Sequence, residues 1–480
     1  MSLGMGIRLL ETLTSALYED PIVFFREYVQ NSADAFIRHP TENSRIDIKI
    51  DEDNRVIEFL DNGYGIDYID FKYKMRGIGI SDKSTAIDQI GFRGIGRLSA
   101  MPFCKKLIFT NKVEGSSEIQ VFSWDGEKYN RLLLQSDSDD LEKAIDDITE
   151  CFTKQYSGDI SDHFFKVELI TYSDEICDLI ETDEFVDNLR KLLPVKYSDS
   201  FSAKDQIHNH YANFMGDSLE KFEFDVYLNG NQLYKPYTDD NILESDIVFW
   251  DLSFEKTSDD MPNEKIGILW FTFNRKVSSN PPKSPRGLYV RSKNMLLGTE
   301  YAIADSVTKG NKEYVATYRE LTQTLNGVYG ELLIDTARLS DNARRDWFRI
   351  DASSIQLRKI LTDYLRKLKA YRYAASQAFN DKQTESKKKK VIIAYEELTK
   401  GFDLKKFEQD FYDIEEESKS ENNFFYADND IPRRSITVKK FYEEILSGLK
   451  EYFIALDKER GIEAFIKMRT FLKQYLNKKD

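Results

Sequence analysis

Cysteine and histidine are scarce in this chain, and their spacing excludes some kinds of site. The 480 residues include only 3 cysteines, Cys104, Cys151 and Cys177, which lie far apart and lack metal-ligand spacing. Such usage is typical of a reducing compartment. The 4 histidines include one close pair, His208 and His210, and no nearby residue completes a zinc site. The sequence therefore indicates neither a disulfide framework nor a zinc centre.

Long apolar runs and an excess of basic residues are lacking too. No run approaches membrane-spanning length, and the N-terminus has no signal-peptide core. The formal net charge of −15 argues against a surface devoted to nucleic acid, although it leaves a local basic groove open. With 41% hydrophobic and 31% charged residues, the composition is that of a globular protein. We therefore expect a soluble, cytoplasmic protein with no membrane partner.

A helix predicted over residues 21–38 carries the most informative pattern. Asp20 is a favourable N-cap for it. The helix is apolar enough to lie in a core, yet Glu27, Asn31 and Asp34 recur at i, i+4 and i+7 and so share one face. Polar groups on a buried helix need partners, whereas the same stripe is also typical of a solvated face. The pattern alone leaves both interpretations open.

A glycine motif follows a predicted hairpin. Alternating residues predict strands over 45–50 and 55–60, and the second strand runs into Asp61-Asn-Gly63-Tyr-Gly65. One interpretation is a common Asn-Gly turn. The other is a carboxylate at a strand end, beside glycines that allow a ligand to approach the backbone closely.

A polar stretch and a second glycine motif come next. Residues 66–90 show no clear period, and we expect them to form a mobile lid. The motif Gly91-Phe-Arg-Gly94-Ile95-Gly96 precedes a predicted helix start, where backbone N–H groups can cradle phosphate. A lone glycine-rich loop is more often a tight turn, so this motif is weak by itself.

The remaining chain suggests three regions. Residues 178–193 predict a helix, and the polar residues 200–220 mark a boundary. We expect a first domain over residues 1–200, an α/β domain over 215–350 and a mainly helical region over 351–480.

In this order, the motifs resemble the GHKL ATPase superfamily of gyrase, the ninety-kilodalton heat-shock chaperones, histidine kinases and MutL. The stretch Leu17–Ala35 is similar, nearly residue for residue, to the first nucleotide-binding helix of the chaperones (the HtpG-like family). Gly91-Phe-Arg-Gly94 is also similar to MutL and the MORC ATPases. The resemblance implies an α+β fold: a two-layer α/β sandwich (Bergerat-type) ATPase domain, then an α/β middle domain and a helical C-terminal region.

The resemblance also implies ATP and Mg²⁺ as cofactors. Glu27 would be the general base, and Asn31 would hold Mg²⁺, which prefers oxygen ligands. Asp61 would accept a hydrogen bond from the adenine amino group, and Gly65 would admit the edge of the base. The ATP-binding set implied is Asn31, Asp34, Asp61, Gly63, Gly65, Lys83, Gly91, Gly94, Ile95 and Gly96. For Lys83, an exposed lysine without such a role is the alternative.

Later stretches extend the resemblance. Gly287–Ser292 is similar to a strand of the chaperone middle domain, and Gly327–Asp346 to the stretch that carries its γ-phosphate arginine. The family pattern selects Arg345 as that catalytic residue, with Arg344 as its neighbour; an exposed basic pair is the alternative.

Two departures from the family stand out. Where the family has Gly-Thr, the threonine of which supports adenine, this sequence has Phe164-Phe165. The chain also ends where the chaperones continue into a dimerisation domain, as expected of a shorter relative or a truncated chain.

We therefore expect a Mg²⁺-dependent ATPase that acts as an ATP-driven clamp of the heat-shock-ninety chaperone type. The alternative is a MORC- or MutL-like ATPase acting in nucleic-acid transactions. A scaffold with an inactive nucleotide fold is the non-enzyme alternative, and Glu27 counts against it. The client or partner proteins have no signature in the sequence, and a homodimer and nucleic-acid binding both stay open.

Overall fold

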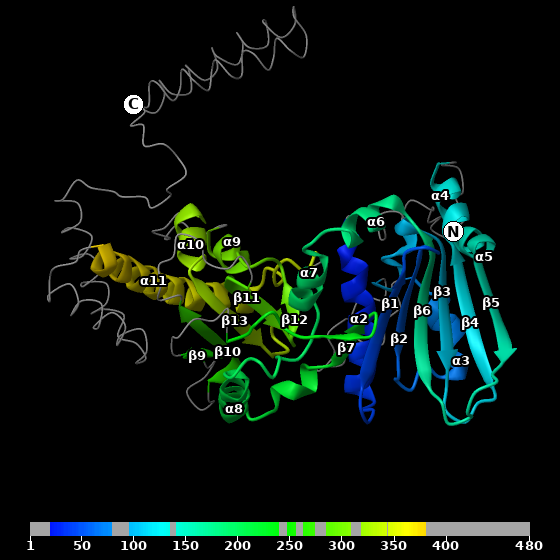
Figure 1. Cartoon of the computed structure of the whole chain (residues 1–480), viewed down its shortest axis with the longest axis horizontal. Helices are drawn as coiled ribbons and strands as arrows, with labels where there is room; N and C mark the ends of the chain where they lie inside the picture. The colour runs from blue at the N-terminus through cyan, green and yellow to red at the C-terminus, as the bar shows by residue number, and fades with distance from the viewer. Residues whose placement is uncertain are drawn as a thin grey trace, which may run out of the picture. The chain divides into compact units, whose positions relative to one another are not determined.

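The structure is a computed structural model that describes residues 20–78, 96–134, 141–239, 247–255, 263–273, 285–308, 318–342 and 344–380. These residues all belong to one compact unit, Met1–Glu417. No helix within the described ranges is both long enough and apolar enough to cross a membrane. Two mixed sheets and their helices make up this α/β architecture (Figure 1).

The first sheet has eight strands in the order β5-β4-β3-β6-β2-β1-β7-β8. Neighbouring strands are antiparallel except β1 and β7, which are parallel. The strands are β1 Arg45–Asp51, β2 Val56–Asp61, β3 Cys104–Lys112, β4 Glu118–Asp125, β5 Thr149–Gln155, β6 Phe164–Tyr172, β7 Asp225–Leu228 and β8 Asn231–Leu233. The hairpin predicted from the alternation of residues 45–60 is thus confirmed as β1 and β2.

Helix α2 (Ile22–Arg38) lies against this sheet (Figure 1). The Asp20 carboxylate accepts a hydrogen bond from the Ile22 N–H (3.0 Å), which caps the first turn as predicted. The helix ends where the His39 N–H donates to the Ala35 carbonyl (2.8 Å). Its aromatic side chains, Phe24 and Phe25 among them, are buried in the core.

The other helices of the first part are short: α3 Tyr68–Arg76, η2 Gly96–Leu98, η3 Met101–Phe103, α4 Gly126–Leu134, α5 Leu141–Ile148, α6 Asp174–Ile180 and α7 Phe185–Leu192. The structure differs from the sequence predictions in two places. The single helix expected over residues 178–193 is two helices, α6 and α7, because turns at residues 181–184 interrupt it. Helix α3 occupies part of the stretch expected to be a mobile lid, and Phe71 and Met75, one turn apart, fix it to the core.

A connecting segment with α8 (Lys204–Met215) and η4 (Leu219–Phe222) leads through β7 and β8 to the second sheet. That sheet has the order β12-β11-β13-β10-β9. Its strands are β9 Val248–Phe254, β10 Glu264–Phe273, β11 Gly287–Ser292, β12 Met295–Leu297 and β13 Val328–Ile334. Helices α9 (Ala302–Thr308), α10 (Tyr318–Leu325) and α11 (Ala352–Asn380) pack with it in one core, and α8 and its flanks in another. The predicted C-terminal region is described only as far as α11.

Buried charges join the connecting segment to the second sheet. Glu331 on β13 is fully buried, and its carboxylate accepts hydrogen bonds from Lys235 Nζ (2.8 Å), the Tyr197 hydroxyl (2.5 Å) and Arg291 Nε. Lys235 and Arg291 are also fully buried. We refer to these four residues as the Glu331 cluster. They tie residues on both sides of α8 to strands β11 and β13.

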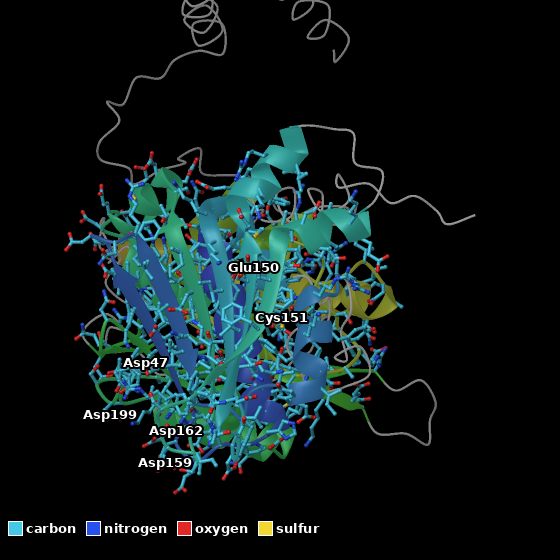
Figure 2. All side chains as sticks on the ribbon, turned by 90° about the vertical axis from the view of Figure 1, so that its right-hand side faces the viewer. Asp47, Glu150, Cys151, Asp159, Asp162 and Asp199 are labelled. Atoms are coloured by element: carbon cyan, nitrogen blue, oxygen red, sulfur yellow. The ribbon has the colours of Figure 1, made fainter. Side chains whose placement is uncertain are left out.

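One edge of the first sheet is exposed. Strand β5 forms that edge, and Glu150 and Cys151 on it are exposed (Figure 2). The loop from β5 to β6 carries Asp159 and Asp162, which lie together at one end of the sheet (Figure 2). This loop leads directly to β6, the strand that pairs with β2 and begins beside Asp61.

Candidate functional site

The predicted polar face of α2 combines buried and accessible groups. Glu27 and Asp34 are buried, whereas Asn31 is partly exposed. A buried carboxylate on an apolar helix is costly unless charges or hydrogen bonds compensate it. The contacts of Glu27 therefore show which groups compensate the burial of its carboxylate.

The Glu27 carboxylate lies between two guanidinium groups. Arg345 Nη1 is 3.3 Å from Glu27 Oε1, and Arg26 Nη2 is 3.6 Å from the same oxygen. The other oxygen, Oε2, faces Gly96 so closely that a Cβ on this glycine would overlap it. The structure thus brings together three predicted site residues from three distant parts of the sequence: Glu27, Gly96 and Arg345.

Arg345 reaches Glu27 from an unusual backbone conformation. Its φ is +54°, in the left-handed region that non-glycine residues seldom adopt. Two backbone hydrogen bonds hold it there, from the Arg345 N–H to the Asn342 carbonyl (3.3 Å) and from the Gly298 N–H to the Arg345 carbonyl (3.0 Å). The neighbouring Arg344 is exposed, whereas Arg345 is buried. Of the basic pair, Arg345 is therefore the one that faces the polar side of α2.

Asp61 ends β2 as predicted, and it is buried. Its Oδ2 accepts from the Ser32 hydroxyl (2.6 Å), and its Oδ1 accepts from the Gly63 N–H (3.0 Å). Burial raises the pKa of Asp61 to about 6, although these two hydrogen bonds and one from the Phe165 backbone lower it. Ser32, which the sequence analysis missed, thus links α2 to the end of β2. Its position next to Asn31 was the available signal.

The glycines of the Asp61 motif allow close packing. A Cβ on Gly63 would lie 2.9 Å from Asp61 Oδ1. Gly65 has φ +72°, and a Cβ there would overlap the Asn111 side chain. Asn111 in turn accepts from the Ile66 N–H (2.8 Å) and donates to the Ile66 carbonyl (2.7 Å). An amide that makes both hydrogen bonds fixes the backbone just after the motif.

On the other side of Asp61 lies β6. The register pairs Asp61 with Phe165, so this aromatic residue occupies the position beside the carboxylate. Two residues earlier, His163 Nδ1 lies 3.1 Å from the Gly63 carbonyl, and its ring stacks on Tyr64 (4.6 Å between centroids). Neither of these two contacts of His163 could be predicted from the sequence, because no local pattern connects residue 163 with residue 63.

Four predicted residues, Lys83, Gly91, Gly94 and Ile95, lie outside the described residues. The described part contains no group of three or more His, Cys, Asp or Glu side chains that could hold a metal ion. The donor set nevertheless suits Mg²⁺ bound together with a polyphosphate, since such ions take one or two protein oxygens and keep waters. Asn31, partly exposed on α2, can supply one such oxygen.

Comparison with known proteins shows that part of the chain is similar to ATPases. Residues 23–154 match the family described as histidine kinase-, DNA gyrase B- and HSP90-like ATPase. The chaperone protein HtpG of Rickettsia typhi is 22% identical over 193 residues, which cover 35% of this chain and 30% of that protein. HtpG of Mesorhizobium japonicum is 28% identical over 141 residues, covering 25% and 22%. The match therefore spans less than a third of either relative.

One solved structure found is the ATPase region of Saccharomyces cerevisiae topoisomerase II. It aligns with a TM-score of 0.37 and 13% sequence identity, over 69% of this chain and 77% of that one. At this TM-score the alignment adds nothing on function.

Proposed function

We propose that this chain, which resembles the GHKL ATPases, binds Mg-ATP and hydrolyses it as a molecular clamp of the heat-shock-ninety chaperone type. The observation that carries the proposal is the contact between Glu27 and Arg345 beside Gly96. It sets a buried base and a buried cation at the end of a glycine-rich stretch. Such pairs of charges are what transfer of a phosphoryl group to water requires.

In this proposal each side chain has one task. The Glu27 carboxylate orients the attacking water and takes a proton on one of its oxygens. Asn31 offers an amide oxygen to Mg²⁺, which neutralises phosphate charge when bound. Asp61 accepts from the 6-amino group of adenine, with Ser32 and the Gly63 N–H holding its carboxylate in place.

Arg345 would stabilise the charge that grows on the phosphate oxygens. A guanidinium is always charged and offers a planar set of donors that suits phosphate. Because Arg345 lies near the second sheet and Glu27 on α2, hydrolysis would depend on the contact between the two parts. This dependence would make the protein a clamp, in which ATP controls how the parts close.

The test of this function is ATP binding by calorimetry in the parent and in Asp61→Asn. We expect the variant to lose ATP binding, because an amide can present its donor end to the adenine amino group. Asp47→Asn is the matched control, since Asp47 lies on the neighbouring strand β1 and pairs with Arg45 at the surface. A folded Asp61→Asn protein with parental affinity would contradict the adenine assignment.

The pH dependence of adenosine binding tests the same carboxylate without interference from phosphate titration. Since the pKa of Asp61 is raised to about 6, its acceptor form is present above pH 6 and is lost as the pH falls through that value. We expect affinity for adenosine to weaken about tenfold between pH 7 and pH 5. Constant affinity over this range would mean that Asp61 does not contact the base.

Salt-dependent DNA binding separates the chaperone-like function from the nucleic-acid alternative. A protein that uses many phosphate contacts loses affinity for DNA steeply as salt rises. Given the net charge of −15, we expect at most weak binding to duplex DNA at low salt. Tight binding with a steep salt dependence would favour the MORC- or MutL-like alternative.

A further inference from the structure

We call the loop Asp61–Gly65 the base loop. Both backbone groups of its central residue, Gly63, have a polar side-chain partner. The Gly63 N–H donates to Asp61 Oδ1 (3.0 Å). The Gly63 carbonyl lies 3.1 Å from His163 Nδ1. A carbonyl can only accept, so His163 must carry its proton on Nδ1. Gly63 thus connects the imidazole to the carboxylate that would recognise adenine.

The His163 ring also packs against the tip of the base loop. Its plane is inclined by 17° to that of Tyr64, with 4.6 Å between centroids, which is a stacked arrangement. His39, just beyond the end of α2, meets the same tyrosine edge-on at 6.4 Å and 77°. Tyr64 is 41% exposed, and the contacts with these two rings restrict the position of its side chain.

A buried lysine holds the backbone of the loop that precedes His163. Lys112 is fully buried, and its ammonium donates to the carbonyls of Val113 (3.0 Å), Ile160 (3.3 Å) and Asp162 (2.8 Å). Three acceptors match the three N–H groups of an ammonium. The loop that bears His163, with Asp162 at its end (Figure 2), therefore has a fixed backbone.

We propose that His163 is a positioning residue of the nucleotide-base subsite and makes it selective for 6-aminopurines. It holds the Gly63 peptide, and through it the Asp61 carboxylate, in the orientation that accepts the adenine amino group. The inference rests on the proposed ATP site. It also accounts for the Phe164-Phe165 departure, because the support for the base loop then comes from the residue just before these two.

Two variants separate the hydrogen bond from the stacking. His163→Asn keeps an N–H donor close to the position of Nδ1 and loses the ring, whereas His163→Phe keeps a flat ring and loses the donor. We expect His163→Phe to bind ATP about tenfold more weakly and His163→Asn to stay within about threefold of the parent. Rescue by asparagine is not expected if the ring merely fills space.

The ligand supplies a second control. Purine riboside triphosphate lacks the 6-amino group, so it cannot report the orientation of Asp61. We expect the parent and His163→Phe to bind it with affinities within about twofold of each other. An equal loss for both nucleotides would mean a general structural role and would overturn the proposal.

Failure of this inference and of the proposed function are distinguishable. If the parent does not bind ATP, both are overturned. If the parent binds ATP and His163→Phe binds it equally well, only the role of His163 is overturned.

A measurement on the parent protein alone avoids dependence on the folding of variants. The chain has only 4 histidines, so ¹⁵N-histidine NMR resolves each imidazole. We expect one ring in the Nδ1–H form to shift on addition of adenosine and not on addition of inorganic tripolyphosphate. If no histidine signal responds to adenosine, the proposal is wrong.

Discussion

Glu27 on α2 and Glu331 on β13 are both buried carboxylates beside two cations, and their surroundings differ. In the Glu331 cluster both carboxylate oxygens accept hydrogen bonds, from Arg291 on one side and from Lys235 and Tyr197 on the other. Glu27, by contrast, has both guanidiniums on the same oxygen, at 3.3 and 3.6 Å, beyond the usual length of a good hydrogen bond. Within the described residues, both oxygens of Glu331 accept hydrogen bonds, whereas the two cations beside Glu27 lie on the same oxygen.

The electrostatics of the Glu331 cluster follow from this saturation. Burial alone would raise the pKa of Glu331, but the charges of Arg291 and Lys235 hold it well below its usual range. Burial lowers the pKa of Lys235, and the Glu331 charge offsets part of that effect. A carboxylate held ionised in this way cannot take up a proton near neutral pH, so it is suited to holding strands together.

The two surroundings differ in the way expected of a structural charge and of the reactive charge proposed for Glu27. Breaking a saturated buried pair leaves uncompensated charge, which is why such clusters persist in a core. A general base needs the opposite arrangement, with an oxygen free to receive a proton. Among the contacts that the structure describes, both guanidinium groups lie beside Glu27 Oε1, whereas Oε2 lies against Gly96, which has no side chain.

The largest expected effect concerns Glu27, the proposed general base. Glu27→Gln should lower the turnover of ATP by about 10² to 10⁴, the usual contribution of a general base. Binding of Mg-ATP should persist, because glutamine keeps the shape of the side chain and a general base acts in the transition state rather than on the bound nucleotide. Steady-state hydrolysis and calorimetry measure the two quantities. Parental turnover in the variant would place Glu27 with Glu331 as a structural charge.

The structural carboxylate should show the reverse pattern. Glu331→Gln leaves Lys235 and Arg291 without their counter-charge, and we expect the free energy of unfolding to fall by about 3–5 kcal/mol. The control is Glu264→Gln on the adjacent strand β10, whose exposed ion pair with Arg338 should contribute at most about 1 kcal/mol. Denaturant unfolding compares them. Equal small losses in both variants would show that the cluster does not stabilise the fold.

The two arginines after Asn342 sharpen the assignment of the cation. Arg345→Ala should reduce turnover by about 10², the typical cost of one lost donor to transition-state charge, with a smaller effect on ATP binding. Arg344→Ala should leave turnover at the parental rate, since this side chain is exposed. Loss of activity in Arg344→Ala alone would shift the assignment by one residue.

A smaller effect is expected from crowding Glu27 Oε2. In Gly96→Ala the added methyl would overlap Glu27 Oε2, which lies at the flexible end of a side chain and can move aside. Stability should therefore change little, while misplacement of the base should lower turnover by up to about 10². Thermal unfolding and hydrolysis rates together check this prediction. A variant that loses stability but keeps its activity per folded molecule would contradict it.

Local patterns were sufficient to predict the elements that carry the site. The period of residues 21–38 gave α2 and the shared face of Glu27 and Asn31, and alternation gave the hairpin that ends at Asp61. Helix α3 was missed because its buried residues, Phe71 and Met75, are too few to set a period. The roles of the predicted site residues stay predictions.

Those local patterns could not predict contacts between distant segments. Ser32 and Asp61 are 29 residues apart, and the packing of α2 against the sheet brings them together. His163 and Gly63 are 100 residues apart, and the register of β2 with β6 brings them together. The Glu331 cluster did leave a signal. Arg291 and Glu331 are single charges within two apolar strands, and a charge in such a strand needs a buried partner.

The parallel pairing of β1 with β7 has a consequence for cutting the chain into pieces. Residues 225–233 come after the segment that the sequence suggested as a boundary, yet they supply the last two strands of the first sheet. A fragment that stops near residue 200 would leave the edge of β1 unpaired and available to other chains, as in aggregation. A fragment that continues to residue 239 would keep that edge covered, and protease-resistant cores should therefore retain β7 and β8.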